Sequence, residues 1–507
     1  MLSAEIILLF FRPFHCLPLS LWCFLALSYT AHGDNNTSKL ESLDLRCTRC
    51  NVIFLNFDFL RADFIGLLNG SDFTQNIDSF FHNSVIFENV SSPAGSSYRG
   101  NLSVMTATEP HIYDIDVNSF HSLQAAKNLG PWEPVFKGNT TIAQLLSKAG
   151  YYTINLNKGI RSGRSTFLDR GFDQYKQFNI RLVIEDLLPS LHQSLSSARR
   201  PFFLLFHPVP TRLHRAFYPL HRRRIQDEDI IYTEYKIDNK PYGYKVLRSR
   251  KPSLLRQRIA EHKIYGQQLR YADDKILDTF SFLEDLLDDS IIVLYSNHGT
   301  QLGDKGIFAS NGVSYQSSVH VPLFIRHPAV TRPIRISTPV SLIDLAPTVY
   351  EFLGMTKPAE STGISLAPLI TGGSYSREFL VGKNDPDEYI RAGNWKLIIR
   401  YRQDRALYDQ RKDPMEKFNI YDSSIQIARR LEYIVNFGSS RSNPIFDGGW
   451  KLVINDQKEF ELYNLESDPG ETRNLANLYP QKRDALSAKL DEFKLQARQR
   501  MRNMVKD

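Results

Sequence analysis

Polar side chains stand at or just after the ends of four apolar runs in this 507-residue chain. In chain order the side chains are Asp58, Lys158, His207, Asn297 and His298, and the runs cover residues 51–57, 151–156, 202–206 and 291–295. A carboxylate, an amide and an imidazole in one place can bind a cation, and an imidazole can also transfer a proton near neutral pH. Such chemistry requires a fold that brings the four ends together.

The apolar runs alternate with segments of helical character, and this alternation predicts such a fold. Further strands are expected at 84–87 and 321–325, and helices at 77–82, 141–149, 259–285 and 342–353. Strands that alternate with helices predict an α/β fold with a mixed, mostly parallel central sheet and helices on both faces. Ligands of such sheets bind outside the carboxyl ends of the strands, so we expect one site there.

The composition is that of a folded globular protein, with 42% hydrophobic, 23% charged and 12% aromatic residues. These values exclude intrinsic disorder and a small disulfide scaffold. The length favours one large domain with a smaller one beside it. We therefore expect a large domain over residues 34–375 and a smaller C-terminal subdomain over residues 376–507.

Residues 1–33 are predicted to be a signal peptide. Their apolar stretch is split by Pro13 and Pro18, and small residues stand at Ala31 and Gly33, as a signal peptidase requires. An uncleaved membrane anchor is the alternative. After cleavage we expect no membrane span, and the protein is predicted to be secreted, periplasmic or in the lumen of the secretory pathway.

Two cysteines, Cys47 and Cys50, remain once residues 1–33 are removed. No second ligand pair follows at zinc spacing, so a local disulfide or two free thiols is the favoured interpretation. Asn-x-Ser/Thr triplets allow a glycoprotein in a eukaryotic host. They begin at Asn35, Asn69, Asn89, Asn101 and Asn139.

Residues 199–258 form a basic insertion in the alternating pattern. They hold 15 Lys and Arg against 5 Asp and Glu, a local charge of +10, whereas the whole chain carries +7. Either the insertion is a solvated surface or it attracts a polyanionic substrate.

The C-terminal region contains an internal repeat. Trp395-Lys-Leu-Ile recurs 55 residues later as Trp450-Lys-Leu-Val, and both copies continue with Leu-Tyr, Asp-Pro, Glu and Asn in the same register. This pattern predicts a duplicated β-hairpin with a turn, and hence a small four-stranded antiparallel sheet beside the main one.

Taken in order, the motifs resemble those of the sulfatases of the alkaline phosphatase superfamily, over nearly the whole chain after residue 33. The segments that carry the resemblance are Asn56–Asp63, Thr74–Asp78, Phe87–Asn89, Gly150–Tyr152 with Lys158, Pro201–His207, Tyr271–Asp274, Ser296–Gly303, Val321–Leu323, Asp344–Thr348 and Trp450–Ala476. The resemblance implies the alkaline phosphatase-like α/β fold.

The resemblance places the nucleophile at Ser97. Sulfatases oxidise a Cys or Ser to formylglycine nine residues before the Thr of a Leu-Thr-Gly, and here Met105-Thr106-Ala107 stands for that tripeptide. The segment Ser97-Tyr-Arg-Gly-Asn101 lacks the proline and the arginine that the modifying enzyme reads. Two forms therefore stay open, namely formylglycine at Ser97 or an unmodified serine acting as an alkoxide, as in relatives that act on phosphoesters.

The resemblance also implies one divalent cation, Ca²⁺ ahead of Mg²⁺ or Mn²⁺. The ligands it implies are Asp58, Asn297 and His298, with Ser97 as a fourth. Phe59 occupies the position of a second Asp, and Asn297 replaces a usual Asp, so the site carries fewer negative charges than the family pattern.

Four cationic groups are implied to contact the substrate. Lys158 matches a lysine that binds the transferred group, and His207 resembles the acid that protonates the leaving group, with His214 as a second candidate. Lys305 takes the place of a histidine of the family pattern. Ile160 and Ser310 stand where a histidine and a lysine are usual.

The function implied is a sulfatase-like hydrolase that cleaves sulfate esters of an anionic glycan. One alternative is a phosphodiesterase or phosphoryl transferase that uses unmodified Ser97. The other is a pseudoenzyme that binds anionic glycans through the basic insertion, which the substituted positions Phe59, Ile160, Asn297 and Ser310 favour. We expect no nucleic acid among the partners.

Overall fold

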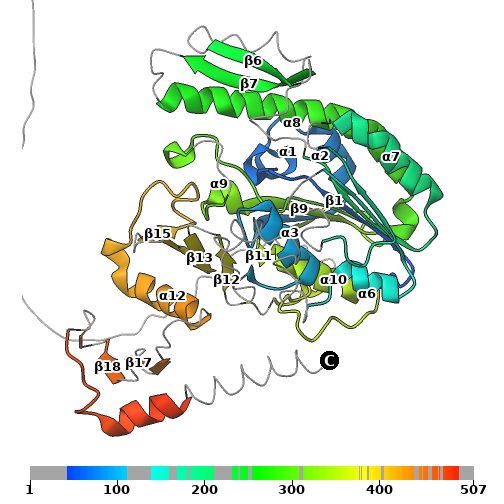
Figure 1. Ribbon diagram of the computed structural model, residues 1–507. Helices are drawn as coiled ribbons and strands as arrows, with labels where there is room; N and C mark the ends of the chain where they lie inside the picture. The colour runs from blue at the N-terminus through cyan, green and yellow to red at the C-terminus, as the bar shows by residue number, and fades with distance from the viewer. Residues whose placement is uncertain are drawn as a thin grey trace, which may run out of the picture. The chain divides into compact units, whose positions relative to one another are not determined.

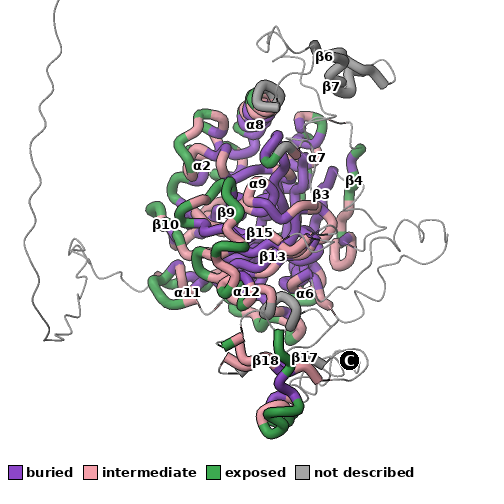
Figure 2. The backbone as a smooth tube through the Cα atoms, turned by 90° about the vertical axis from the view of Figure 1, so that its left-hand side faces the viewer, coloured by how far each residue is buried: buried purple, intermediate pink, exposed green. Residues whose placement is uncertain are grey.

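The computed structural model describes residues 43–489 apart from a set of gaps (Figures 1 and 2). The gaps are residues 111–138, 159–167, 180–181, 183, 210–230, 238–239, 249–253, 308–311, 376, 378, 385–386, 401–404, 439–444, 448, 455–459, 466 and 469–471. The predicted signal peptide, Ile160, His214 and Ser310 therefore lie outside the described residues.

The central sheet has nine strands, of which eight follow the order β10-β2-β9-β8-β1-β5-β3-β4, while β11 pairs with β2. Their bounds are β1 Asn51–Asn56, β2 Val85–Ser91, β3 Tyr152–Asn157, β4 Gln174–Gln177, β5 Phe202–His207, β8 Ser290–Tyr295, β9 His320–Arg326, β10 Ile334–Ile336 and β11 Val340–Ser341. Strand β9 is antiparallel to β8 and β2, and the other described pairings of this sheet are parallel. The mixed, mostly parallel sheet is confirmed.

Two hydrophobic cores lie on the two faces of this sheet, because successive side chains of a strand point to opposite faces. Val52 and Phe54 of β1 belong to one core, and Ile53 and Leu55 belong to the other. The first core is covered by α3 Ser97–Thr106, α6 Ile142–Lys148, α10 Leu345–Phe352 and α11 Ala367–Ile370. The second is covered by α1 Gly66–Asn69, α2 Gln75–Phe81, α7 Ile184–Ser197 and α8 Leu254–Glu284. Figure 2 shows the buried strands between these helical layers.

The remaining helices are short, apart from α12. They are η1 Ala62–Phe64, η6 Leu287–Asp289, η7 Asp304–Gly306, α9 Gln316–Val319, η8 Leu342–Asp344, η9 Asp422–Ser424 and α12 Ile425–Gly438. None of the described helices is both long and apolar enough to cross a membrane.

The strands and helices expected from the sequence are all present, with shifted ends. The structure adds β4, β10 and β11, which the apolar pattern does not reveal. Strand β4 reads Gln-Tyr-Lys-Gln and its side chains are half-buried or exposed, since it lies at the edge of the sheet. Within the basic insertion, β6 Ile231–Ile237 and β7 Lys240–Arg248 pair as an antiparallel hairpin.

Two separate antiparallel sheets follow in the C-terminal region. One joins β12 Leu380–Lys383, β13 Asp387–Ala392, β14 Trp395–Arg400 and β15 Arg405–Asp409, and the other joins β16 Ile445–Asp447, β17 Trp450–Ile454 and β18 Phe460–Asn464. The four-stranded sheet therefore holds only the first copy of the repeat, which corrects the expectation of one sheet. The subdomain boundary at residue 376 stays a prediction.

The two copies of the repeat make matching hydrogen bonds. The side chain of Asn419 accepts the Leu407 amide and donates to the Arg405 carbonyl, and Asn474 does the same with Leu462 and Phe460. In the turns, Asp413 accepts the amides of Lys417 and Phe418, and Asp468 accepts those of Thr472 and Arg473. The two copies therefore share their turn structure as well as their sequence.

Cys47 and Cys50 form a disulfide immediately before β1. This confirms one of the two interpretations of the pair, a local disulfide.

Candidate active site

Asp58 is the first of the predicted site residues, and it follows β1 in the centre of the sheet. It is 3% exposed. One carboxylate oxygen lies 3.1 Å from Nε2 of His298, and the other accepts the Ser97 hydroxyl at 3.1 Å. Burial raises the pKa of Asp58, but the imidazoles of His298 and His207 and the Ser97 hydroxyl outweigh it and hold the pKa below its usual value. The side chain is therefore a carboxylate anion at neutral pH.

Ser97 is the first residue of α3, a ten-residue helix. Its Oγ lies 2.9 Å from Nε2 of His298 and close to Asp58. The N-terminus of a helix carries a partial positive charge, which stabilises negative charge on a nearby oxygen. The position suits a nucleophile that becomes negatively charged.

Asn297 and His298 follow β8, the neighbour of β1 in the sheet, and both are fully buried. The Asn297 backbone amide donates to Oδ1 of Asn56, and the Asn56 amide group donates to Oδ1 of Asn101 at 2.7 Å. This chain of three asparagines joins β1, α3 and the end of β8. The sequence alone did not identify Asn56 and Asn101 as site residues, and only their polar character within buried segments could have indicated them.

Gly100 allows α3 to approach the segment after β8 closely. A Cβ atom there would lie 2.7 Å from the Asn297 carbonyl oxygen, far inside ordinary contact distance. The glycine therefore fixes how near Ser97 comes to His298.

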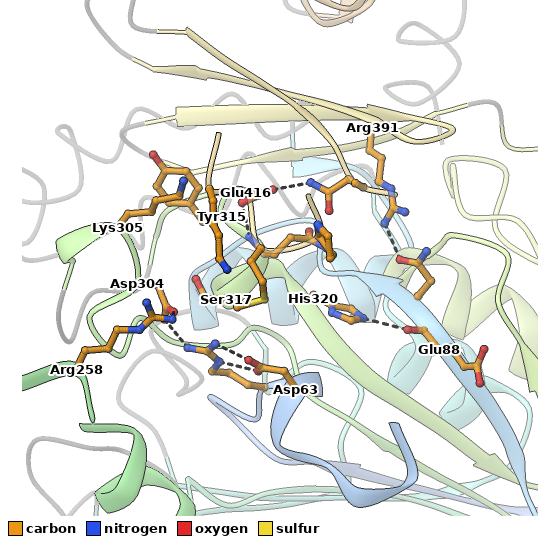
Figure 3. Close-up of a pocket in the computed structure, with 17 residues that line it drawn as sticks. Asp63, Glu88, Arg258, Asp304, Lys305, Tyr315, Ser317, His320, Arg391 and Glu416 are labelled. Carbon is orange, nitrogen blue, oxygen red and sulfur yellow. Dashed lines mark hydrogen bonds and ion pairs between the residues drawn. The ribbon is translucent and has the colours of Figure 1, made fainter. Parts of the chain in front are cut away.

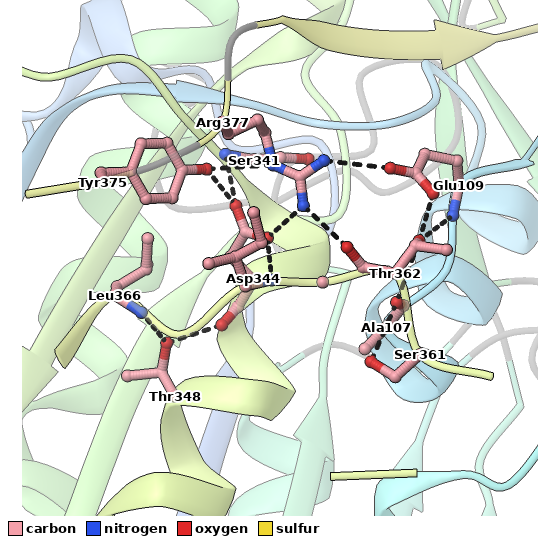
Figure 4. Close-up of polar contacts among 12 residues, drawn as sticks. Ala107, Glu109, Ser341, Asp344, Thr348, Ser361, Thr362, Leu366, Tyr375 and Arg377 are labelled. Atoms are coloured by element: carbon pink, nitrogen blue, oxygen red, sulfur yellow. Dashed lines mark hydrogen bonds and ion pairs between the residues drawn. The ribbon is translucent and has the colours of Figure 1, made fainter. Parts of the chain in front are cut away.

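The far end of α3 is held by a buried polar network (Figure 4). Arg377 pairs with Asp344 at 2.7 Å and with Glu109 at 3.0 Å, and it donates to the Thr362 carbonyl. The Thr362 amide in turn donates to the carbonyl of Ala107, the residue that ends α3. Both ends of the helix that begins with Ser97 are thus anchored.

The two ring nitrogens of His298 have different partners, because Nδ1 contacts the backbone and Nε2 faces Ser97. Nδ1 lies 2.6 Å from the Gly299 carbonyl oxygen, and because a carbonyl only accepts, Nδ1 carries the proton. A protonated ring donates from Nε2 to the Asp58 carboxylate, which is how His298 lowers the pKa of Asp58, whereas a neutral ring presents a lone pair at Nε2 to Ser97 Oγ and Asp58. Three electron-pair donors converge here, an arrangement that a cation among them stabilises.

Lys158 and His207 lie at the ends of β3 and β5, and both are 2% exposed. The Lys158 amide donates to the His207 carbonyl at 2.9 Å, so the two strand ends are joined. Nε2 of His207 lies 3.5 Å from a carboxylate oxygen of Asp58. The structure therefore brings Asp58, Ser97, His207 and His298 together, with Lys158 at the adjacent strand end.

Phe59 has a left-handed backbone, with φ of 66°. A bulky residue rarely adopts this conformation, which is typical of functional or strained positions. The Tyr265 hydroxyl donates to the Phe59 carbonyl and accepts the Arg61 amide, and the Phe59 ring meets the His298 ring edge-on, with 4.6 Å between centroids. An aromatic ring thus contacts His298 where the family pattern has a carboxylate.

Lys305 is the one predicted site residue that the described structure does not join to this group. Its ammonium lies over the rings of Tyr315 and Tyr408, and it makes no hydrogen bond or ion pair with Asp58, Ser97 or His298. His214 lies outside the described residues.

The sulfatase family model matches residues 50–355, more than half of the chain. The chain belongs to the sulfatase family. A second model, described as N-sulphoglucosamine sulphohydrolase, C-terminal, matches residues 303–436, which include the four-stranded sheet of this sulfatase.

Individual relatives match this sulfatase over parts of their length. Choline-sulfatase of Rhizobium meliloti is 27% identical over 172 residues, which are 32% of this chain and 33% of that protein. The matches span about a third of the length of the first curated relatives. Activity, substrate and partners are therefore matters of proposal.

Solved structures show the same fold at low sequence identity. The phosphonate monoester hydrolase of Agrobacterium radiobacter has a TM-score of 0.58 at 17% identity, covering 77% of this chain and 95% of the other. A 2-O GAG sulfatase has a TM-score of 0.54 at 17% identity, covering 77% and 93%. These likenesses confirm the alkaline phosphatase-like α/β fold of this sulfatase.

Sulfatases use a divalent metal ion. Among the described residues, no group of three or more His, Cys, Asp and Glu side chains could hold an ion. A set that includes an amide and a hydroxyl does fit. Oδ1 of Asn297 is buried without a hydrogen-bond partner, and the amide nitrogen of the same side chain donates to the Ser97 carbonyl at 3.4 Å. Oxygen-rich sets of this kind suit Ca²⁺ or Mg²⁺, although a single carboxylate supplies the negative charge.

Proposed function

We propose that this protein is a hydrolase that cleaves sulfate esters of an anionic glycan. The observation that carries the proposal is the position of Ser97. Its hydroxyl stands at the N-terminus of α3, 3.1 Å from the Asp58 carboxylate and 2.9 Å from the His298 imidazole. A hydroxyl between a base and a helix N-terminus is an activated nucleophile.

The residues of the site have separate roles in this reaction. The Ser97 hydroxyl gives its proton to Asp58, to which it already donates, and Oγ forms a bond to sulfur while the ester S–O bond breaks and His207 gives a proton to the departing alcohol oxygen. Lys158 supplies positive charge for the sulfuryl oxygens. Water then attacks sulfur and gives a proton to His207, the bond from sulfur to Oγ breaks, Oγ takes its proton back from Asp58, and hydrogen sulfate leaves.

Asp58, Asn297, His298 and Ser97 would hold one divalent cation, with Ca²⁺ ahead of Mg²⁺ or Mn²⁺. When bound, such an ion supplies positive charge that lowers the pKa of a bound hydroxyl and stabilises charge on the ester oxygens. Support comes from the closeness of Ser97, Asp58 and His298 and from the buried Oδ1 of the neighbouring Asn297, which has no hydrogen-bond partner.

The chemical form of Ser97 separates the candidate reactions. Mass spectrometry of the peptide that contains Ser97 distinguishes formylglycine from unmodified serine. Hydrolysis of an aryl sulfate by the purified protein, lost in Ser97→Ala, is the expected result. Hydrolysis of an aryl phosphodiester with no action on the sulfate would replace the proposal with phosphoester chemistry, and no hydrolysis of either would support a glycan-binding pseudoenzyme.

We also propose that the protein is a secreted or secretory-pathway glycoprotein. The apolar segment within residues 1–33 and the Cys47–Cys50 disulfide support an oxidising compartment. Among the sequon asparagines, Asn69 is exposed at the end of α1, whereas Asn101 is 5% exposed inside α3. Glycan on Asn69 and none on Asn101 is the expected outcome of peptide mapping.

A further inference from the structure

A cavity of about 500 Å³ lies beside the candidate active site (Figure 3). Arg61 and Ser317 line it, and both contact the segment that follows His298. Arg61 donates to the Thr300 carbonyl, and the Thr300 amide donates to the Ser317 carbonyl. Asp58, Ser97 and His298 are not among the lining residues, so the two places share a wall without being one pocket.

The carboxylates that line this cavity are already neutralised. Asp63 and Asp304 pair with Arg61, each at 2.6 Å, and Arg258 adds a contact to Asp304. The other two pairs are Glu88 with Arg335 at 2.9 Å and Glu416 with the buried Lys396 at 2.7 Å. No acidic group on the wall is left to balance a further cation.

Three lining cations, Lys305, Arg391 and Lys417, form no close ion pair among the described residues. The carboxylate that acts electrostatically on both Lys305 and Arg391 is Glu416, which Lys396 already pairs. Arg391 is 5% exposed and donates only to neutral groups, the side chain of Asn89 at 2.6 Å and the Gly393 carbonyl. Lys305 lies over the rings of Tyr315 and Tyr408. The wall therefore has an excess of positive charge.

One buried acceptor in the wall also lacks a partner. Gln410 is 7% exposed, and its amide nitrogen donates to Glu416 at 3.0 Å, while its Oε1 has no hydrogen-bond partner. A buried carbonyl oxygen of this kind is costly unless a ligand donates to it. The cavity thus offers positive charge for an anionic group and an acceptor for a hydroxyl or amide proton.

From these features we infer that the cavity binds a second anionic sugar unit of the same glycan whose sulfate ester is cleaved at Ser97. This inference rests on the proposed function. The chemistry recognised is a sulfate or carboxylate together with sugar hydroxyls. Strand β9, whose first residue His320 lines the cavity, pairs antiparallel with β8, so its start lies toward the end of β8 that precedes Asn297 and His298.

Calorimetric titration of the Ser97→Ala protein tests the inference without turnover. The probes are a sulfated disaccharide and the matching sulfated monosaccharide. Lys417→Met and Gln410→Met are each expected to weaken disaccharide binding, by roughly tenfold for a lost charged contact, and to leave monosaccharide binding unchanged. Lys412→Met is the matched control, because Lys412 is 75% exposed and does not line the cavity.

The same substitutions in the active protein should raise KM for the disaccharide and leave kcat unchanged, with thermal melts that report intact folding. Equal disaccharide affinity in all variants would overturn the inference, as would an equal loss for the monosaccharide, which would mean that the cavity holds a lone sugar. If the wild-type protein hydrolyses no sulfate ester while Lys417→Met weakens disaccharide binding, the proposed reaction is wrong but the proposed binding site is supported.

Discussion

Asn297 is the residue at which the proposed cation site is one charge short. Its buried Oδ1 has no hydrogen-bond partner, and an amide contributes no negative charge to a cation. Asn297→Asp should therefore tighten Ca²⁺ or Mg²⁺ binding by about tenfold or more in calorimetric titration, and should lower stability in the presence of chelator, since an unpaired buried carboxylate is costly.

Asn394→Asp adds the same charge at an exposed position in the turn between β13 and β14. It should leave cation affinity unchanged. An equal gain in both variants would show a non-specific effect of charge, and no gain at residue 297 would show that Asn297 is not a ligand.

The site residues at the strand ends were predictable because each one follows an apolar run, and the sheet topology brings those ends to one edge. Asp58, His207 and His298 meet for this reason. The contact of Phe59 with His298 was not predictable, because it depends on a left-handed backbone that Tyr265, from α8, holds in place. Contacts of this kind depend on side chains from segments far apart in the sequence.

At the scale of single elements, the packing of α3 sets the geometry of the nucleophile. Gly100→Ala places a Cβ 2.7 Å from the Asn297 carbonyl oxygen, so the helix must move away from the end of β8. We expect a loss of about 1–3 kcal/mol in the free energy of unfolding and a large fall in kcat. Ser103→Ala in the same helix is the control, since the Ser103 hydroxyl is buried without a hydrogen-bond partner and its removal should be nearly neutral.

The polar network at the other end of α3 is expected to make the stability cost of Arg377→Met depend on pH. Asp344 is fully buried and pairs with Arg377, so Arg377→Met leaves a buried carboxylate without its cation and should cost about 3–5 kcal/mol at pH 7. Burial raises the pKa of Asp344, and Arg377 opposes that rise. Without Arg377 the pKa rises further.

A carboxyl group whose pKa is raised in the folded state favours folding at low pH and loses that contribution as the pH rises through the folded pKa. The penalty of Arg377→Met should therefore be smaller at pH 5 than at pH 7 in urea unfolding. Arg335→Met, which breaks a half-exposed pair with Glu88, should cost about 0–1 kcal/mol at both pH values. A penalty for Arg377→Met that grows on acidification would contradict this account.

Elements were predictable where their apolar pattern was strong. Strands β1, β5 and β8 are buried on both faces and read as continuous apolar runs. The edge strand β4 is polar, and β11 has two residues, so neither has a period to detect.

At the scale of the whole molecule, charge is concentrated in one segment. Residues 199–258 carry a charge of +10, whereas the whole chain carries +7, so the rest of the chain is slightly acidic. Replacing Arg222, Arg223 and Arg224, which lie outside the described residues, with Gln should lower the salt concentration at which the protein leaves a heparin column, with no change in Tm.

The control for this prediction is a triple replacement with Gln at exposed cations outside the basic insertion, at Arg332, Arg411 and Lys412. It should shift elution less. Equal shifts in the elution salt concentration would show that the basic insertion contributes no more to heparin binding than other surface cations.

The arrangement of the C-terminal repeat was predictable only in part. The register of Trp, Leu-Tyr and Asp-Pro identified two equivalent units, and the side chains of Asn419 and Asn474 make the same bonds in both. That the copies pair into different sheets depends on which strand joins each one, and a single sequence contains no signal for that choice.

Each copy closes its turn with an asparagine and an aspartate of its own, so neither turn depends on the other copy. The loss of the later copy would therefore leave the turn bonds of the earlier copy in place, whereas the earlier copy also contacts the central sheet, since Arg391 in β13 donates to Asn89 in β2. A stop codon after residue 438 would delete the later copy while the earlier one kept its turn bonds intact. In evolutionary terms, this end of the protein is a place where length changes are tolerated, whereas the strand ends around Asp58 are not.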